Sequence, residues 1–232
     1  MSTPAEATAP KQPTLEELLG PSLLTSAKEG AKKATAAALK DKDLILLYFS
    51  ASWCPPCKTF SPLLIDFYNK INKDAKLEVI YVASDRTIDD FKAYYGKMPW
   101  LAVPSDEGAA AIKNGLAEKL KITGIPTLVV LDKAGNFVTD QAREAVTAAA
   151  ADKTKSMDLC KEWKEAESVP LAQAKLGQSG SSFFAGGFMG IVMAILKNPM
   201  YIFGMIYIVK WVMRQIDEMK KSGGALDQDK EL

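Results

Sequence analysis

The chain has 232 residues, of which 48% are hydrophobic and 25% are charged, and its net charge is +1. This is the composition of an ordinary globular protein with enough apolar material for a packed core. The near-neutral charge gives no support for nucleic-acid binding. The sequence holds no histidine, which excludes Ser-His-Asp triads, Cys-His nucleophile pairs and the commonest zinc ligand.

The N-terminal part of the chain has a weak structural pattern. Residues 1–15 are rich in Ala, Thr, Pro and Lys, and we expect a flexible arm. They lack the apolar run of a secretory signal, and their acidic residues argue against a mitochondrial presequence. Residues 18–24 are expected to enter a short strand or turn, and the alanine-rich segment 27–39 is predicted to be helical.

Buried strands and amphipathic helices alternate through the middle of the chain. Apolar runs at 44–49, 77–83 and 127–131 predict strands, and 137–139 is predicted to return as a hairpin partner after a turn. The spacing of apolar residues predicts helices at 57–73, 89–96 and 109–120. This alternation predicts a three-layer α/β/α sandwich with a mixed central sheet, in a domain of residues 16–168.

The motif Trp53-Cys54-Pro55-Pro56-Cys57 directly follows the first predicted strand and opens a helix. Free backbone N–H groups and the helix dipole stabilise a thiolate there, so a lowered pKa makes Cys54 the attacking nucleophile. Cys57, one turn later, is placed to resolve a mixed disulfide. A zinc half-site or two inert thiols are the alternatives, but zinc needs further Cys or His ligands.

Neighbouring residues are expected to support this chemistry. Pro55 and Pro56 remove two backbone donors and stiffen the loop, while Trp53 offers a flat apolar surface to partners. Ile125 and Pro126 precede the third strand, where a proline is tolerated. A cis peptide bond at this position would place the loop beside the two sulfurs.

The third cysteine, Cys160, lies on a predicted helix near the end of the domain. We expect a buried thiol that acts as a small apolar side chain. A regulatory thiol is the alternative.

Together these motifs resemble the tryparedoxin and nucleoredoxin branch of the thioredoxin superfamily. The resemblance covers roughly residues 17–165 and rests on the segments 48–57, 84–86, 97–104 and 124–128. It implies that Cys54 is the nucleophile, Cys57 the resolving thiol, Pro126 the cis-proline and Trp53 part of the site wall. Tyr48 stands where ordinary thioredoxins have a buried carboxylate, so the thioredoxin proton relay is not expected.

The resemblance also implies an enzyme, a protein-disulfide reductase that acts on disulfide-containing proteins such as peroxiredoxins. No bound cofactor or metal is expected, and a low-molecular-weight dithiol or a reductase would donate the electrons. The alternative is a thioredoxin-like accessory subunit of a mitochondrial membrane complex, with a mainly structural role.

The C-terminal part of the chain has a different composition. Residues 169–182 are expected to be a linker, 183–213 an apolar membrane segment and 214–232 a polar tail. We predict a span at about 199–213, with one long kinked helix as the alternative. Basic residues after the span are typical of a tail anchor. We therefore expect a mitochondrial membrane, with the redox domain facing the cytosol, and the endoplasmic reticulum as the alternative.

Overall fold

The computed structural model describes residues 12–27, 30–106, 108–174 and 214. The chain divides into two units, residues 1–179 and 180–232, and the fold given below is that of the first. Among the described residues, no helix is long and apolar enough to cross a bilayer. The predicted membrane segment, 183–213, lies outside the described residues.

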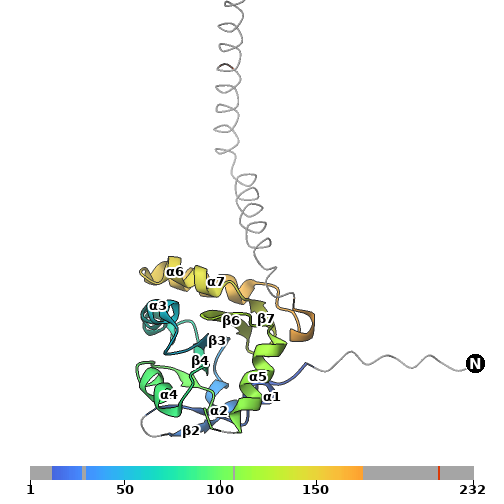
Figure 1. Ribbon diagram of the computed structural model, residues 1–232. Helices are drawn as coiled ribbons and strands as arrows, with labels where there is room; N and C mark the ends of the chain where they lie inside the picture. Colours follow the sequence, from blue (N-terminus) through green and yellow to red (C-terminus); the bar gives the residue numbers. More distant parts are fainter. Residues whose placement is uncertain (1–11, 28–29, 107, 175–213, 215–232) are drawn as a thin grey trace, which may run out of the picture. The chain divides into compact units, whose positions relative to one another are not determined.

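A seven-stranded mixed sheet forms the centre of the domain, in the order β2-β1-β5-β4-β3-β6-β7 (Figure 1). β4 pairs in parallel with β3 and β5, and the other pairings are antiparallel. The strands are β1 (Ser22–Leu24), β2 (Lys32–Ala34), β3 (Leu44–Ser50), β4 (Leu77–Ala83), β5 (Leu101–Ala102), β6 (Thr127–Asp132) and β7 (Phe137–Thr139). The helices are α1 (Leu15–Leu19), α2 (Thr35–Leu39), α3 (Pro55–Ile71), α4 (Ile88–Tyr95), α5 (Ala109–Lys119), α6 (Ala142–Ala149) and α7 (Lys153–Glu165), followed by a 3₁₀ turn (Leu171–Gln173).

The alternation of side chains along β3 builds a core on each face of the sheet. Every residue of β3 is buried, as predicted for a strand covered on both sides. Leu44, Leu46 and Tyr48 belong to the cluster with α3, α4, α6 and α7. The two residues between them, Ile45 and Leu47, belong to the cluster with α1, α2 and α5. The predicted three-layer α/β/α sandwich with a mixed sheet is therefore confirmed.

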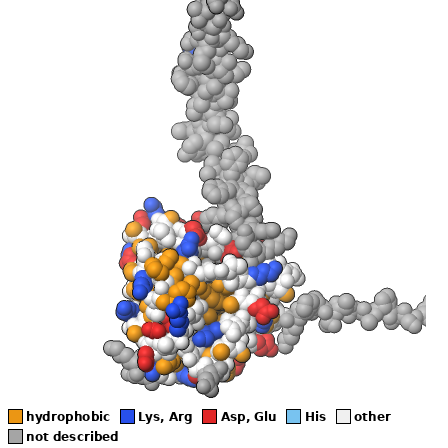
Figure 2. Space-filling view, viewed as in Figure 1, with side chains coloured by type: hydrophobic (Ala, Val, Ile, Leu, Met, Phe, Trp, Pro, Cys, Tyr) orange, Lys and Arg blue, Asp and Glu red, His pale blue; other side chains and the backbone are white. Residues whose placement is uncertain are grey.

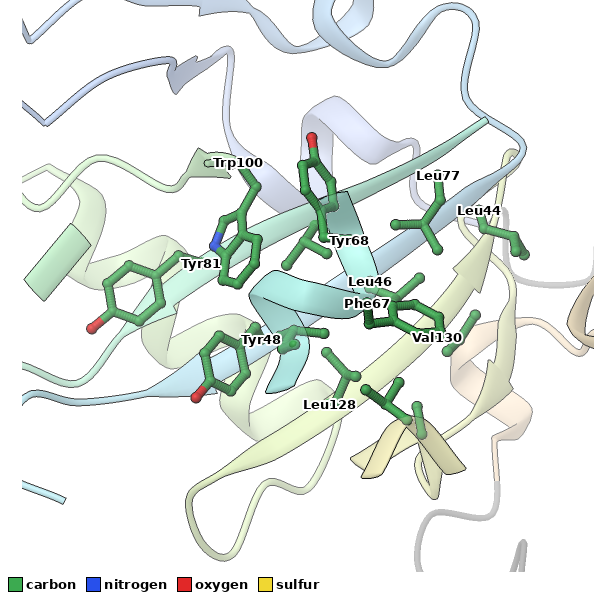
Figure 3. Close-up of a cluster of buried hydrophobic side chains, with 14 of the residues drawn as sticks. Leu44, Leu46, Tyr48, Phe67, Tyr68, Leu77, Tyr81, Trp100, Leu128 and Val130 are labelled. Carbon is green, nitrogen blue, oxygen red and sulfur yellow. The ribbon is translucent and has the colours of Figure 1, made fainter. Parts of the chain in front are cut away.

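The core on the α3 side combines aromatic and aliphatic side chains (Figure 3). The ring of Trp100 packs edge-on against Tyr48 and Tyr68, with centroid distances of 6.1 and 5.5 Å. Tyr48 and Tyr81 direct their hydroxyl groups toward the same end of the cluster, away from the aliphatic Leu77. This arrangement keeps the hydroxyl oxygens of Tyr48 and Tyr81 at one edge of the apolar core, where they have hydrogen-bond partners.

Segment 27–39 is not the single helix that its alanine content predicts. Lys32–Ala34 forms β2 and pairs antiparallel with Ser22–Leu24, and only Thr35–Leu39 is helical. Gly30 takes a positive φ of 59° before β2, a conformation that glycine adopts without strain. Strand pairing thus outweighs the modest helix preference of alanine.

Residues just outside both ends of the predicted domain, 16–168, also pack against it. Gln12 lies in the predicted arm, but its side chain donates to the Gly135 carbonyl at 3.0 Å and accepts from the Leu171 N–H at 3.2 Å. Val169 forms an antiparallel bridge with Phe137, and Leu171 is buried. The packed unit therefore includes the last residues of the predicted arm and continues past residue 168.

Candidate active site

Cys54 and Cys57 form a disulfide at the start of α3, with their Cα atoms 5.3 Å apart. Cys54 is the N-cap residue, so α3 begins at Pro55, two residues before its predicted start. Proline is tolerated there because the first N–H groups of a helix have no partner within it. The N–H of Cys57 points at the Cys54 sulfur, 3.4 Å away. The end of the helix therefore favours negative charge on that sulfur.

The loop before β6 forms one wall of the site. The Ile125–Pro126 peptide bond is cis, as predicted, and the Ile125 carbonyl oxygen lies 3.7 Å from the Cys54 sulfur. Ile125 also packs against the small buried cluster of Ala51, Cys54 and Cys57. The sequence prediction that this loop lies beside the two sulfurs is therefore correct.

Trp53 is the large exposed side chain next to the disulfide. Its exposed fraction is 46%, whereas those of Cys54 and Cys57 are 4% and 0%. The indole N–H donates to the Ser84 carbonyl at 2.9 Å, and the Arg86 guanidinium lies 5.1 Å from the ring centroid. This cation–π contact and the hydrogen bond hold the indole in place while leaving part of its surface open to a partner.

Asp85 ties the end of β4 to the loop that precedes Trp53. Its carboxylate accepts hydrogen bonds from the Ser52 N–H, at 2.7 Å, and from the Tyr81 hydroxyl. Burial, and next the hydrogen bond to Asp85, raise the pKa of Tyr81, so the phenol remains a donor. No role for Asp85 follows from the sequence alone, because its contact with Ser52 joins two segments that are far apart in the chain. The polar run that directly follows a buried strand was the available signal.

A buried cluster of hydroxyl groups lies behind Cys57. Tyr48 and Ser61 place their oxygens 2.9 Å apart, and Ser50 donates to Tyr48 at 3.0 Å. Ser61 also donates to the Cys57 carbonyl at 2.9 Å and lies 2.7 Å from the Tyr94 hydroxyl. Burial raises the pKa of Tyr48. The position that holds a carboxylate in ordinary thioredoxins is therefore occupied here by a neutral phenol.

Helix α6 brings one further side chain to the cis-proline loop. Arg143 places a guanidinium nitrogen 3.5 Å from the Pro126 carbonyl oxygen, and it also forms an ion pair with Glu144. No role for Arg143 follows from the sequence alone, because its contact joins α6 to a loop 17 residues earlier in the chain. The contact links α6 to the loop that faces the disulfide.

Cys160 lies on α7, away from the disulfide, in the core beneath α3. Its exposed fraction is 1%, and burial raises the pKa of its thiol to about 12. The buried position predicted for Cys160 is confirmed, and its thiol stays protonated at neutral pH.

Comparison with known proteins places the site in a family. The Thioredoxin-like family profile matches residues 41–137. Tryparedoxin from Trypanosoma brucei brucei is 42% identical over 103 residues, which are 44% of this chain and 70% of that protein. The chain belongs to the tryparedoxin and nucleoredoxin branch of the thioredoxin-like proteins. Within this branch, nucleoredoxin 1 from Arabidopsis thaliana is 42% identical over 142 residues, 60% of this chain and 24% of that protein.

A solved structure of the same branch has a similar fold. Tryparedoxin II complexed with glutathionylspermidine shares 38% sequence identity with this chain at a TM-score of 0.51. The match covers 56% of this chain and 88% of that chain. The matched region thus covers 70% of the length of the Trypanosoma brucei brucei tryparedoxin but only 24% of the length of nucleoredoxin 1.

Proposed function

We propose that this chain is a thiol–disulfide oxidoreductase that reduces protein disulfides through Cys54 and Cys57. One observation carries the proposal: the two cysteines form a disulfide at the N-terminus of α3, beside the cis-proline loop. The pair can therefore store two electrons as a dithiol and release them as a disulfide. No bound cofactor is needed, because the two sulfurs carry the electrons themselves.

The reaction begins from the reduced pair. The Cys54 thiolate attacks one sulfur of the partner's disulfide, and the partner's other sulfur leaves as a thiolate that takes a proton from water. Cys57 then loses its proton, attacks the Cys54 sulfur and releases the partner's first sulfur. The partner has gained two electrons, and Cys54 and Cys57 are left as the observed disulfide. Two donor thiols, oxidised in turn to a disulfide, regenerate the dithiol.

We infer the two ends of this electron path from the branch to which the chain belongs. The proposed donor is a low-molecular-weight dithiol or a reductase. The solved complex of tryparedoxin II with glutathionylspermidine supports a low-molecular-weight compound as the donor. The proposed acceptors are disulfide-containing proteins such as peroxiredoxins.

A turnover assay on the full chain tests the activity. Wild type should reduce a model protein disulfide with a dithiol donor, and Cys54→Ser should reduce the rate to that of the donor alone. Cys160→Ser is the matched control because it removes a buried thiol outside the site. If wild type is no faster than Cys54→Ser, the enzyme proposal fails. The accessory-subunit role, which needs no dithiol, would then be favoured.

We also propose that the chain is anchored in a membrane by the apolar segment 183–213, with the span at about 199–213. The apolar composition of 183–213 supports the anchor, because this segment is longer than the about 20 mostly apolar residues of a spanning helix. The span at 199–213 is shorter than that, so it needs neighbouring residues of the segment to complete the crossing. The proposed location is a mitochondrial membrane with the redox domain in the cytosol, and the endoplasmic reticulum is the alternative. Carbonate extraction should leave the full chain in the membrane pellet, and release into the supernatant would contradict the anchor. Microscopy of the tagged full chain separates the two membranes.

A further inference from the structure

A groove of about 560 Å³ runs along α3 from the end that carries the redox motif. The residues of α3 that line it recur every three or four positions, so they form one stripe along the helix. The opposite wall comes from the end of α4 and the loop before β5. The lining residues are Lys58, Ser61, Pro62, Ile65, Asp66, Asn69, Tyr94, Lys97 and Met98. A groove of this volume accommodates a short stretch of peptide.

The groove has an excess of positive charge. Lys58 and Lys97 are exposed, and neither forms an ion pair within the part of the chain that the structure describes. The acidic residue Asp66 is already paired with Lys70, at 2.6 Å. Figure 2 shows Lys and Arg side chains beside hydrophobic ones on the side of the domain where α3 and α4 lie. The two free ammonium groups therefore favour an occupant that carries carboxylates.

The groove also has an apolar surface with a fixed shape. Ile65 and Met98 are partly buried and pack against the main core, and Pro62 lines the groove about one turn of α3 before Ile65. Side chains anchored in a packed core change position little. The groove is therefore preformed, and it suits a segment that combines apolar side chains with acidic ones.

The groove is connected to the dithiol through the hydroxyl groups behind Cys57. Lys58 directly follows Cys57 in the sequence, and Ser61 donates to the Cys57 carbonyl at 2.9 Å. Tyr94, on the opposite wall, lies 2.7 Å from the Ser61 oxygen. No cysteine lines the groove, so a small thiol bound there would not contact the reacting sulfurs. A larger partner can occupy the groove with one segment and present its disulfide with another.

We propose that this groove binds an acidic, partly apolar segment of the protein whose disulfide is reduced. The proposal rests on the proposed function, because it assigns a docking surface to the protein substrate. Lys58 and Lys97 determine the preference for acidic partners, while Ile65 and Met98 supply the apolar contact. The groove therefore controls the affinity for the partner, and the two cysteines carry out the exchange.

A peptide titration tests the groove directly. The probe is a fluorescein-labelled peptide, Glu-Leu-Glu-Glu-Leu-Glu, with Gln-Leu-Gln-Gln-Leu-Gln as its uncharged match. Binding to the oxidised full chain in mild detergent is measured by fluorescence anisotropy. We expect Lys58→Glu with Lys97→Glu to raise the dissociation constant for the acidic peptide by about tenfold or more. The uncharged peptide should bind wild type more weakly than the acidic peptide does. Its dissociation constant should change little in the double variant.

The matched control carries the same charge change outside the groove. Lys119 on α5 and Lys155 on α7 are exposed and do not line the groove, so their double change to Glu should alter the dissociation constant by less than about twofold to threefold. An equal loss in both variants would show only long-range attraction and would overturn the site. Absence of binding, or binding unaffected by Lys58→Glu with Lys97→Glu, would overturn it as well.

A separate assay distinguishes this proposal from the proposed function. The same wild-type preparation is tested for reduction of dithiobisnitrobenzoate, a small disulfide that needs no docking segment. A protein that reduces this compound but does not bind the acidic peptide contradicts the groove alone. A protein that binds the peptide but reduces no disulfide contradicts the proposed function.

Discussion

The backbone N–H of Cys57 points at the Cys54 sulfur across the first turn of α3, at 3.4 Å. This contact and the free end of the helix favour a thiolate at Cys54. Cys57 is completely buried, while Cys54 retains a small exposed area. The geometry thus assigns different roles to two residues of the same type: Cys54 meets the partner and Cys57 attacks from within.

Alkylation of the reduced protein should distinguish the two sulfurs. We expect iodoacetamide to modify Cys54 first, with a rate that reaches half its maximum below about pH 8.5, the value for a free cysteine. Mass spectrometry after brief labelling at several pH values measures this. The Cys57→Ser variant keeps Cys54 as the one thiol of the motif and serves as the control. Faster labelling of Cys57 than of Cys54 would contradict the assignment.

Cys160 should not react under the same conditions. Its burial and its pKa of about 12 keep it a protonated thiol between pH 7 and 9. Labelling of the native protein should leave Cys160 unmodified, whereas labelling in denaturant should modify it fully. Rapid labelling of Cys160 in the native protein would show that α7 opens readily.

Removal of the Asp85 carboxylate should loosen the loop before Trp53. Asp85→Ala leaves the Ser52 N–H and the Tyr81 hydroxyl without their shared acceptor. We expect the free energy of unfolding to fall by about 1.5–3 kcal/mol and hydrogen exchange at Ser52 to become faster. Denaturant unfolding and exchange mass spectrometry measure the two effects.

The control for this change is an exposed aspartate on another helix. Asp158→Ala on α7 should not lower the free energy of unfolding by more than about 0.5 kcal/mol. If the two variants have the same stability, Asp85 does not support the site in the way its contacts indicate.

The stability of the domain should fall at alkaline pH. Burial raises the pKa of Tyr48, Tyr68, Tyr81 and Tyr95 in the folded state. Above pH 10 the unfolded phenols therefore lose protons that the folded protein keeps, and the unfolded state is favoured. Each such group lowers the free energy of unfolding by up to about 1.4 kcal/mol per pH unit. Urea unfolding at pH 7.5 and pH 10.5 measures the loss.

Tyr48→Phe separates one phenol from the rest. The variant should be about 1 kcal/mol less stable at pH 7.5, because it loses its hydrogen bonds with Ser50 and Ser61. Between pH 7.5 and pH 10.5, the free energy of unfolding of the variant should fall by less than that of wild type. Equal stability of wild type at both pH values would contradict the role of the buried phenols.

Much of the fold could be predicted because its decisive signals are local. The short apolar run before Cys54 is typical of a strand covered on both faces, and it forms β3. The motif itself indicates a helix N-terminus, and the proline before β6 indicates the loop beside it. These features depend on neighbouring residues, so a single sequence contains them.

The features that sequence reasoning missed depend on contacts between distant segments. β2 exists because Lys32–Ala34 pairs with β1, although its own composition favours a helix. Asp85 and Arg86 acquire their roles only when β4 ends beside Trp53. The groove along α3 likewise needs Lys97 and Met98 to be brought against the helix by the turn after α4. None of these pairings can be deduced from spacing along the chain.

Trapping of the mixed disulfide tests the central claim most directly. Cys57→Ser, reduced and mixed with a protein that carries one accessible disulfide, should form a stable covalent adduct because the resolving thiol is absent. Mass spectrometry of the digested adduct should place the bond at Cys54, and Cys54→Ser should form no adduct. A bond to Cys57 in Cys54→Ser, or no adduct with Cys57→Ser, would contradict the account.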